Sequence, residues 1–276
     1  MPEAHYLKRF SESNADPGIR DKALRVLTTV DQHAIEFTQK AASGELFLFE
    51  ERQSIDGILT RSEAEWIYKN HFAARSSAGR PIYDYLKQGA PNFICPLCGI
   101  RHVTTLDHYL PQSKHPSFVV TYENLVPSCM DCNKAKGSRS PTSNGDQTIH
   151  PYFDEVQNTQ WLFARFANQN SVVLEFEAKP SNDIDRALAE RISRHFTKLN
   201  LNELYQAQAA EELANIRYRL SLLGDAGGET AIRGHLKETF DSRYARRKNS
   251  WQSSFYQACY LSDWFIAGGY RLIPEP

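Results

Sequence analysis

The chain has 276 residues, of which 41% are hydrophobic, so it is long enough to bury a sizeable core. No stretch approaches the roughly 18 uninterrupted apolar residues of a membrane-spanning helix, and the first 20 residues lack the basic start and apolar middle of a signal peptide. The formal net charge of -1 gives no global attraction to nucleic acid, so phosphate binding would have to come from local patches. We therefore expect a cytoplasmic protein without a membrane anchor.

Residues 1–90 predict a mostly helical N-terminal region. Apolar side chains recur there at three- and four-residue steps, as on one face of a helix: Ala23, Leu24, Leu27, Val30, Ala34 and Phe37. A second helix is expected from about Ser62 to Ala74, because Ser62 and Glu65 fit a capping box. Neither this region nor the C-terminal region contains the phosphate-binding loop Gly-x-x-x-x-Gly-Lys-Ser/Thr, so the chain alone is not expected to hydrolyse ATP.

Four of the five cysteines form two Cys-x-x-Cys pairs, Cys95/Cys98 and Cys129/Cys132, which thirty residues separate. Each pair can present two thiolates to one tetrahedral zinc ion, and two unrelated pairs of buried thiols seldom show this twin spacing. Four thiolates leave no open coordination position, so the zinc is expected to be structural. Five cysteines are too few for a disulfide scaffold in a chain of this length, which agrees with a reducing cytoplasm. Cys259 stands in an apolar helix and is expected to pack in the core.

Between the two cysteine pairs the sequence predicts a hairpin that carries chemistry. Residues 103–108 form a β-branched run that ends in Asp107 and His108, side chains of the kinds that bind metal and move protons. Residues 122–127 fit the return strand.

A short helix is expected to follow at the second cysteine pair. Ser128 and Asp131 fit a capping box at its start, and Gly137 offers its C-terminal end. Asn133 and Lys136 then lie three apart, on one face of the helix.

This strand, loop, strand and helix, stapled by zinc, resembles the ββα-metal core of the HNH endonucleases over about residues 93 to 140. Four motifs carry the resemblance: Cys95-x-x-Cys98, Leu106-Asp107-His108-x-x-Pro111, Asn124-Leu125, and Cys129-x-x-Cys132-Asn133-x-x-Lys136. The resemblance implies that His108 is the general base that activates water, and that Asp107 and Asn133 hold one divalent cation. It further implies that Asn124 orients the His108 ring. The last motif position is Asn133 instead of histidine, a departure also seen among HNH enzymes, where asparagine still binds the metal.

The chemistry of these side chains agrees with the implied roles. An unperturbed imidazole titrates near neutral pH, which suits His108 as the base, and a neighbouring metal can stabilise the developing charge and the leaving oxygen. Oxygen ligands from Asp107 and Asn133 favour magnesium or manganese over zinc at this second site. We therefore expect two metals with separate duties.

Two further sets of residues surround the motif. Three cations on or just after the short helix would bind flanking phosphates, unless they form an ordinary solvated cluster: Lys134, Lys136 and Arg139. Three histidines are kept out of the catalytic set as structural residues: His102, His115 and His150. Of these, His150 is expected to anchor the turn into the hairpin that follows.

Residues 151–276 predict a β-hairpin followed by helices. Residues 161–166 and 172–176 fit two strands joined by a polar turn. From Asp183 onward the pattern is helical, with an interruption at residues 224–228.

The most basic window of the chain, residues 233–248, fits two interpretations equally well. It is either an auxiliary DNA-binding face or a solvated helix, because acidic residues oppose its charge locally. The aromatic residues that interleave with this window fit the buried side of C-terminal helices better than a base-stacking platform.

The sequence thus predicts an α+β, predominantly helical fold with three segments: an N-terminal helical region (1–90), an HNH core with a four-cysteine zinc site (91–150), and a β-hairpin with a C-terminal helical region (151–276). The function expected first is metal-dependent hydrolysis of DNA phosphodiester bonds. A non-catalytic, zinc-stabilised module that binds nucleic acid or protein is the alternative.

The layout is also similar to the nuclease subunits of bacterial anti-phage systems, including Septu-type and retron-linked ones, which implies activation by an ATPase or a sensor subunit. A monomer with one site would nick DNA, whereas a homodimer could cut both strands.

Overall fold

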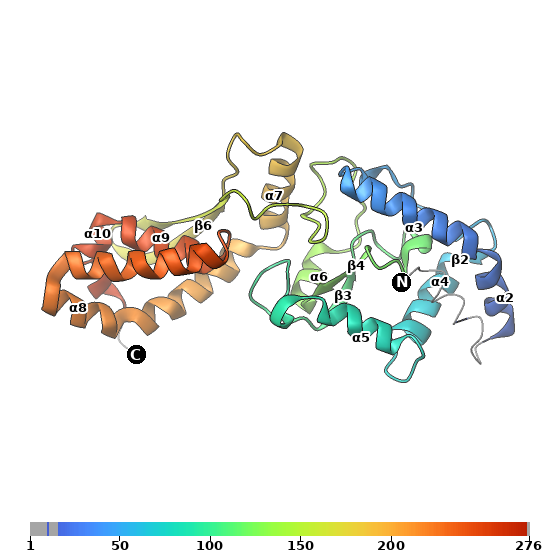
Figure 1. The fold of residues 1–276 in the computed structure, drawn as a ribbon, viewed down its shortest axis with the longest axis horizontal. Helices are drawn as coiled ribbons and strands as arrows, with labels where there is room; N and C mark the ends of the chain where they lie inside the picture. Colours follow the sequence, from blue (N-terminus) through green and yellow to red (C-terminus); the bar gives the residue numbers. More distant parts are fainter. Residues whose placement is uncertain (1–9, 11–15, 275–276) are drawn as a thin grey trace. The chain divides into compact units, whose positions relative to one another are not determined.

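The computed structural model describes Phe10 and residues 16–274, and the chain divides into two compact units, with the boundary in the sequence between Asp154 and Glu155 (Figure 1). The expected N-terminal region and the expected HNH core lie together in the first unit. The fold is α+β and predominantly helical, as predicted. Within the described residues, no helix combines the length and the apolar character needed to cross a membrane.

The first unit contains helices α2 (Pro17–Arg25) and α3 (Leu27–Ala42). Asp16 caps α2, because its carboxylate accepts a hydrogen bond from the Ile19 amide at 3.1 Å. The helical conformation is interrupted at Val26, between the two helices. The expected apolar face is therefore not continuous, and Leu24 is 47% exposed. The first unit also contains η1 (Leu46–Leu48), β1 (Ser54–Ile55), β2 (Leu59–Thr60), α5 (Arg80–Gln88), η3 (Pro91–Phe93) and η4 (Pro116–Phe118).

Helix α4 (Arg61–Ile67) starts earlier and ends earlier than the sequence predicts. Its capping box joins Thr60 and Glu63, so the predicted box of Ser62 and Glu65 is wrong. Strand β2 holds Thr60 in the extended conformation that an N-cap residue requires, and this selects the first of two overlapping Ser/Thr-x-x-Glu patterns. The helix does not continue to Ala74, because it passes into a π-helix, η2 (Tyr68–Phe72).

The predicted hairpin and helix are present at the centre of the first unit. Strand β3 (Thr105–His108) pairs antiparallel with β4 (Leu125–Ser128), and α6 (Met130–Lys136) follows. Gly137 ends α6 at φ 68°, a left-handed conformation that favours glycine, as predicted.

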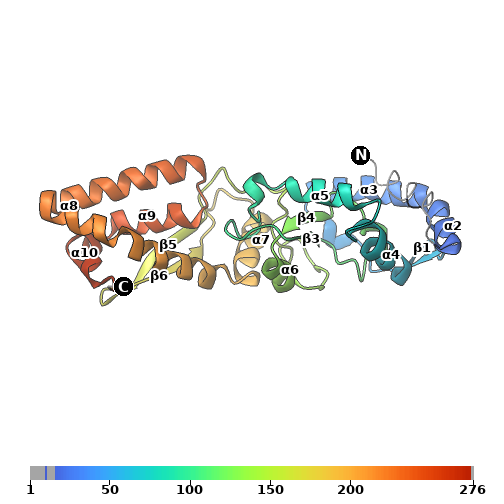
Figure 2. The ribbon, with the colours of Figure 1, turned by 90° about the horizontal axis from the view of Figure 1, so that it is seen from below.

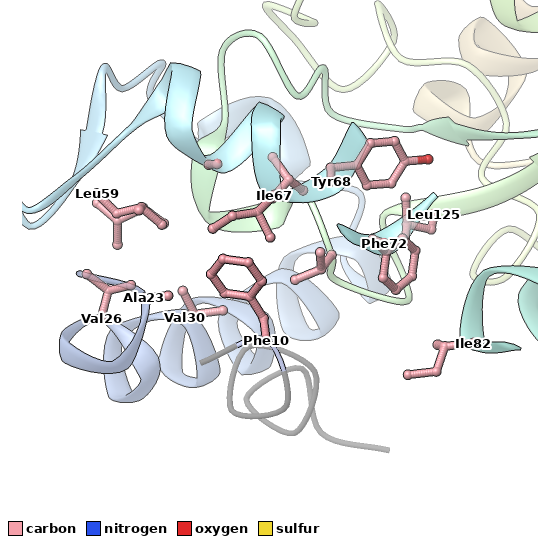
Figure 3. Packing of buried hydrophobic residues seen from close by; sticks show 14 of the residues in the cluster. Phe10, Ala23, Val26, Val30, Leu59, Ile67, Tyr68, Phe72, Ile82 and Leu125 are labelled. Atoms are coloured by element: carbon pink, nitrogen blue, oxygen red, sulfur yellow. The ribbon is translucent and has the colours of Figure 1, made fainter. Parts of the chain in front are cut away.

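One hydrophobic core joins the N-terminal helices to the hairpin. Leu106 of β3 and Leu125 of β4 belong to the same buried cluster as side chains from α2 to α5. Figure 3 shows Leu125 beside Phe72 of η2, with Ile67 of α4 a short way along the same packing layer. The N-terminal helices therefore share a core with the β3–β4 hairpin and help to hold it in place.

The second unit contains the predicted hairpin, β5 (Leu162–Asn168) and β6 (Ser171–Ala178), followed by helices. These are α7 (Arg186–Lys198), α8 (Leu201–Arg246), α9 (Trp251–Leu261), α10 (Asp263–Ile266) and η5 (Gly269–Leu272). The predicted interruption is confined to Gly228 (φ 61°, ψ -152°), where α8 reverses its direction (Figures 1 and 2). The C-terminal helices pack on the hairpin, with the rings of Phe166 and Phe265 stacked 4.9 Å apart.

Candidate active site and metal centre

The four paired cysteines come together in the first unit. Cys95 and Cys98 lie in a tight loop closed by a 2.8 Å hydrogen bond from the Cys95 amide to the Arg101 carbonyl. Their sulfurs and those of Cys129 and Cys132 all lie within 4.8 Å of one another, and all four residues are buried. With Zn–S bonds of about 2.3 Å, the sulfurs of a tetrahedral site lie about 3.8 Å apart. The spacing therefore fits one four-coordinate metal ion.

Crowding couples the protonation of these thiols. Hydrogen bonds from Cys129 and its neighbours hold the pKa of Cys98 far below its usual range, while similar bonds raise the pKa of Cys132. The hydrogen bond with Cys132 lowers the pKa of Cys129. Four negative sulfurs at this spacing repel one another unless a cation lies between them, and metal binding lets all four ionise. The donor set is therefore suited to a thiophilic ion such as zinc.

The end of strand β3 positions the two residues expected to carry the chemistry. Asp107 and His108 lie opposite residues 125–126 of β4. Because successive strand residues point to opposite faces, the two side chains diverge. Asp107 meets Lys136 of α6, and His108 meets the carbonyl of Val119 in the loop between the strands.

His108 is held as a neutral imidazole with a defined tautomer. Its Nε2 lies 2.9 Å from the Val119 carbonyl oxygen. Because a carbonyl can only accept, Nε2 must carry the hydrogen, which leaves the lone pair on Nδ1. Burial lowers the pKa of His108 to about 4, and the Lys136 charge adds to this effect. At neutral pH the ring is therefore uncharged, with its acceptor lone pair on Nδ1.

Asp107 and Lys136 form a buried ion pair beside the histidine. The Lys136 ammonium lies 3.3 Å from the Asp107 carboxylate, and the two side chains are only 10% and 5% exposed. The same ammonium donates to the carbonyls of His108 at 2.8 Å and Tyr109 at 3.1 Å. Burial nevertheless raises the pKa of Asp107 to about 6, although Lys136 opposes the rise. The structure thus places Lys136 inside the site, whereas the sequence predicted a surface contact with phosphate.

Asn124 is fully buried and binds backbone groups. Its Oδ1 accepts from the Leu110 amide at 2.6 Å, and its Nδ2 donates to the carbonyls of Leu110 at 3.1 Å and Phe118 at 2.9 Å. These bonds tie the chain just after β3 to the residue before Val119. The sequence predicted that Asn124 orients the His108 ring. Its hydrogen bonds go to the backbone of the loop, so any effect on the ring acts through the position of this loop.

Helix α6 carries the remaining expected ligand. Asn133 is half-buried and lies three residues before Lys136, so the two residues share one face of the helix. The N-cap of α6 is Cys129, whose sulfur accepts from the Cys132 amide at 3.4 Å, so the predicted capping role of Ser128 is wrong. The second cysteine pair itself thus starts the helix.

The other two expected phosphate contacts stay on the surface. Lys134 is exposed, and Arg139 is exposed with its guanidinium 3.2 Å from the Asp146 carboxylate. Lys134 is therefore the more available cation of the two for a phosphate.

The three histidines kept out of the catalytic set all pack against aromatic rings. His150 is 1% exposed, and its Nδ1 and carbonyl accept hydrogen bonds from the turn at residues 152–154, in agreement with the predicted anchoring role. His115 is buried with its Nε2 3.1 Å from the Ser140 hydroxyl, and burial lowers its pKa to about 4. His102 is exposed and stacks on Phe93.

The basic window of the second unit is partly neutralised. Arg233 pairs with Asp263 and Lys237 pairs with Asp241, both at 2.7 Å. The aromatic residues around the window include buried Trp251, Phe255 and Tyr256 of α9, as predicted for a helix core.

Tyr68 is a site residue that the sequence did not reveal. It lies outside the motif, in the π-helix η2, and its ring centroid is 4.4 Å from that of His108 at an interplanar angle of 67°. Burial raises the pKa of this phenol well above its usual range, and the charge of Asp107 adds to the rise. No spacing signal marks Tyr68, because the contact depends on the tertiary packing of η2 against β3.

The HNH endonuclease family model matches residues 95–139, which include both cysteine pairs, the hairpin and α6. This segment is an HNH domain, as its motifs predicted. Over 220 residues the chain is 27% identical to Protein ea31 of Escherichia phage lambda, an alignment that covers 76% of this chain and 74% of that protein. Over 58 residues it is 38% identical to Septu protein PtuB of Bacillus thuringiensis, covering 21% of this chain and 22% of PtuB. No solved structure is significantly similar to the chain.

Proposed function

We propose that the protein is a metal-dependent endonuclease that hydrolyses DNA phosphodiester bonds with His108 as general base. The observation that carries the proposal is the 2.9 Å contact between His108 Nε2 and the Val119 carbonyl, which leaves Nδ1 as the proton acceptor. Asp107, the residue before His108 at the end of the same strand, supplies a carboxylate. The match to the HNH endonuclease family supports this class of chemistry.

Each residue of the site has a separate task in this proposal. His108 removes a proton from the attacking water at Nδ1. Asp107 and Asn133 supply oxygen donors suited to magnesium or manganese, and such an ion would stabilise the charge that develops on the phosphate and the leaving oxygen. Lys136 fixes the end of β3 through two carbonyl contacts, which keeps both functional side chains in place. We assign zinc to the four cysteines as a structural ion.

The test is cleavage of supercoiled plasmid by purified protein in magnesium, manganese or EDTA. We expect nicked or linear DNA only with the divalent ion, and loss of the product with His108→Ala. His102→Ala is the matched control, because this exposed histidine lies in the same domain. If wild type and His108→Ala cleave equally, the assignment of the base is wrong.

The second candidate is a non-catalytic, zinc-stabilised module that binds nucleic acid or protein. The observation that favours it is the ammonium of Lys136, which already compensates the Asp107 carboxylate at 3.3 Å. This candidate predicts no cleavage with any metal and unchanged binding to DNA by His108→Ala.

We further propose that the nuclease acts in bacterial anti-phage defence and is activated by an ATPase or sensor subunit. The similarity to Septu protein PtuB supports this role, while the longer similarity is to a phage protein. The reduced thiols that a four-cysteine zinc site requires favour a cytoplasmic location.

Double-strand cleavage would need a homodimer. Analytical ultracentrifugation of the protein in the presence of DNA would detect such a dimer. An inert wild-type chain that cleaves once a neighbouring ATPase is added would support activation by a partner.

A further inference from the structure

The N-terminal helical region contributes a side chain to the nuclease site. Tyr68 lies where α4 gives way to η2, and the Ala73 amide donates to the Tyr68 carbonyl at 2.8 Å, the five-residue step of a π-helix. Such wide turns occur often at functional sites. In Figure 3 the Tyr68 hydroxyl points away from Ile67 and Phe72, at the margin of the core cluster.

The ring of His108 needs more than its one hydrogen bond to keep a fixed orientation. The bond from Nε2 to Val119 fixes one atom of the ring, but the terminal torsion of histidine is broad, so the ring plane can still tilt about that point. The edge-to-face contact with Tyr68, at 4.4 Å and 67°, restrains this tilt. Since Tyr68 is 7% exposed and belongs to the buried cluster, packing from several elements holds its ring in place.

We propose that Tyr68 is a positioning residue, whose aromatic ring holds the His108 imidazole in the orientation that presents Nδ1 for proton transfer. The proposal rests on the proposed nuclease function and assigns a residue outside the HNH segment to its active site. Only the ring is required, because the contact is made by ring faces and edges.

The matched variants are Tyr68→Phe, which keeps the ring, and Tyr68→Met, which fills the space with a flexible chain. Tyr68→Leu is a second ring-free variant. Phe72→Met is the control for the loss of a buried ring, because Phe72 is a fully buried aromatic residue of the same π-helix. Thermal unfolding of each zinc-loaded protein shows whether it is folded.

The first readout is magnesium-dependent plasmid nicking, with kcat and KM measured separately. We expect Tyr68→Phe to stay within about threefold of wild type, and the ring-free variants to lose about 10- to 100-fold in kcat with little change in KM. Phe72→Met should stay within about threefold. Equal losses in Tyr68→Met and Phe72→Met, or full activity in folded Tyr68→Met or Tyr68→Leu, would overturn the proposal.

The second readout does not depend on cleavage. Long-range ¹H–¹⁵N NMR of the imidazoles should show sharp His108 signals of the Nε2–H tautomer in wild type and Tyr68→Phe, and broadened His108 signals in the ring-free variants, because the ring then tilts between orientations. Equally sharp His108 signals in Tyr68→Met would refute the positioning role. If wild type fails to cut DNA, the nuclease proposal fails, while this comparison still decides the role of Tyr68.

Discussion

Replacing Asp107 by asparagine should stabilise the protein in the absence of magnesium, although it removes a proposed metal ligand. Asp107 is 4% exposed, and burial raises its pKa from the ordinary 3.8 to about 6 in spite of Lys136. Because the folded state holds this proton more tightly than the unfolded state, stability is lost as the pH rises from about 4 to about 6. At about 1.4 kcal/mol per pH unit, the loss at pH 7.5 is about 3 kcal/mol.

The assay is thermal and denaturant unfolding of zinc-loaded protein without added magnesium or manganese. Asp107→Asn should gain about 3 kcal/mol over wild type at pH 7.5 and about half of that at pH 5. Asp131→Asn is the control, because its side chain is 65% exposed and its ion pair with Arg101 lies at the surface. Magnesium should then stabilise wild type but not Asp107→Asn. A lower stability of Asp107→Asn at pH 7.5 would refute the reasoning, since the buried carboxylate would then be net stabilising.

Three other changes test the centre and its surroundings. Cys132→Ala should lower the zinc content measured by atomic absorption and destabilise the first unit, whereas Cys259→Ala, at a buried cysteine of the second unit, should keep one zinc per chain. Lys136→Met should cost about 3 kcal/mol in denaturant unfolding, because it strips a buried carboxylate and two carbonyls of their donor, while Lys134→Met at an exposed position should cost less than about 0.5 kcal/mol. Burial lowers the pKa of His115 from 6.5 to about 4, so the free energy of unfolding should fall as the pH drops below 6.5. In urea titrations, His115→Gln should reduce the loss of stability between pH 7.5 and pH 5 by about 2 kcal/mol. An unchanged loss would contradict the assignment of this pH dependence to His115.

Motifs with fixed spacing predicted the cysteine cluster and the strand that ends in Asp107 and His108. The two Cys-x-x-Cys pairs specify their own cluster, and the β-branched run that ends in Asp107 and His108 specifies a strand end. Gly137 marks the end of α6, because its positive φ is open mainly to glycine.

Contacts that depend on tertiary packing were not predictable in the same way. Lys136 was expected at the surface, but α6 packs so that its ammonium lies against Asp107. The helix starts at Thr60 and Cys129 were missed because Ser62 and Ser128 fit the same local patterns, and only the neighbouring strand and the cysteine cluster decide between them. Tyr68 carries no local signal, since its role arises from the contact of η2 with His108.

The most direct test of the account is single-turnover cleavage of a 5′-labelled DNA duplex by wild type and His108→Ala in magnesium, with the product ends identified. The account predicts no product in EDTA and a rate at least about 100-fold lower for His108→Ala, and the resemblance to HNH endonucleases implies 5′-phosphate and 3′-hydroxyl ends for wild type. Cleavage of equal rate in the folded His108→Ala variant, or cleavage that persists without a divalent ion, would contradict it.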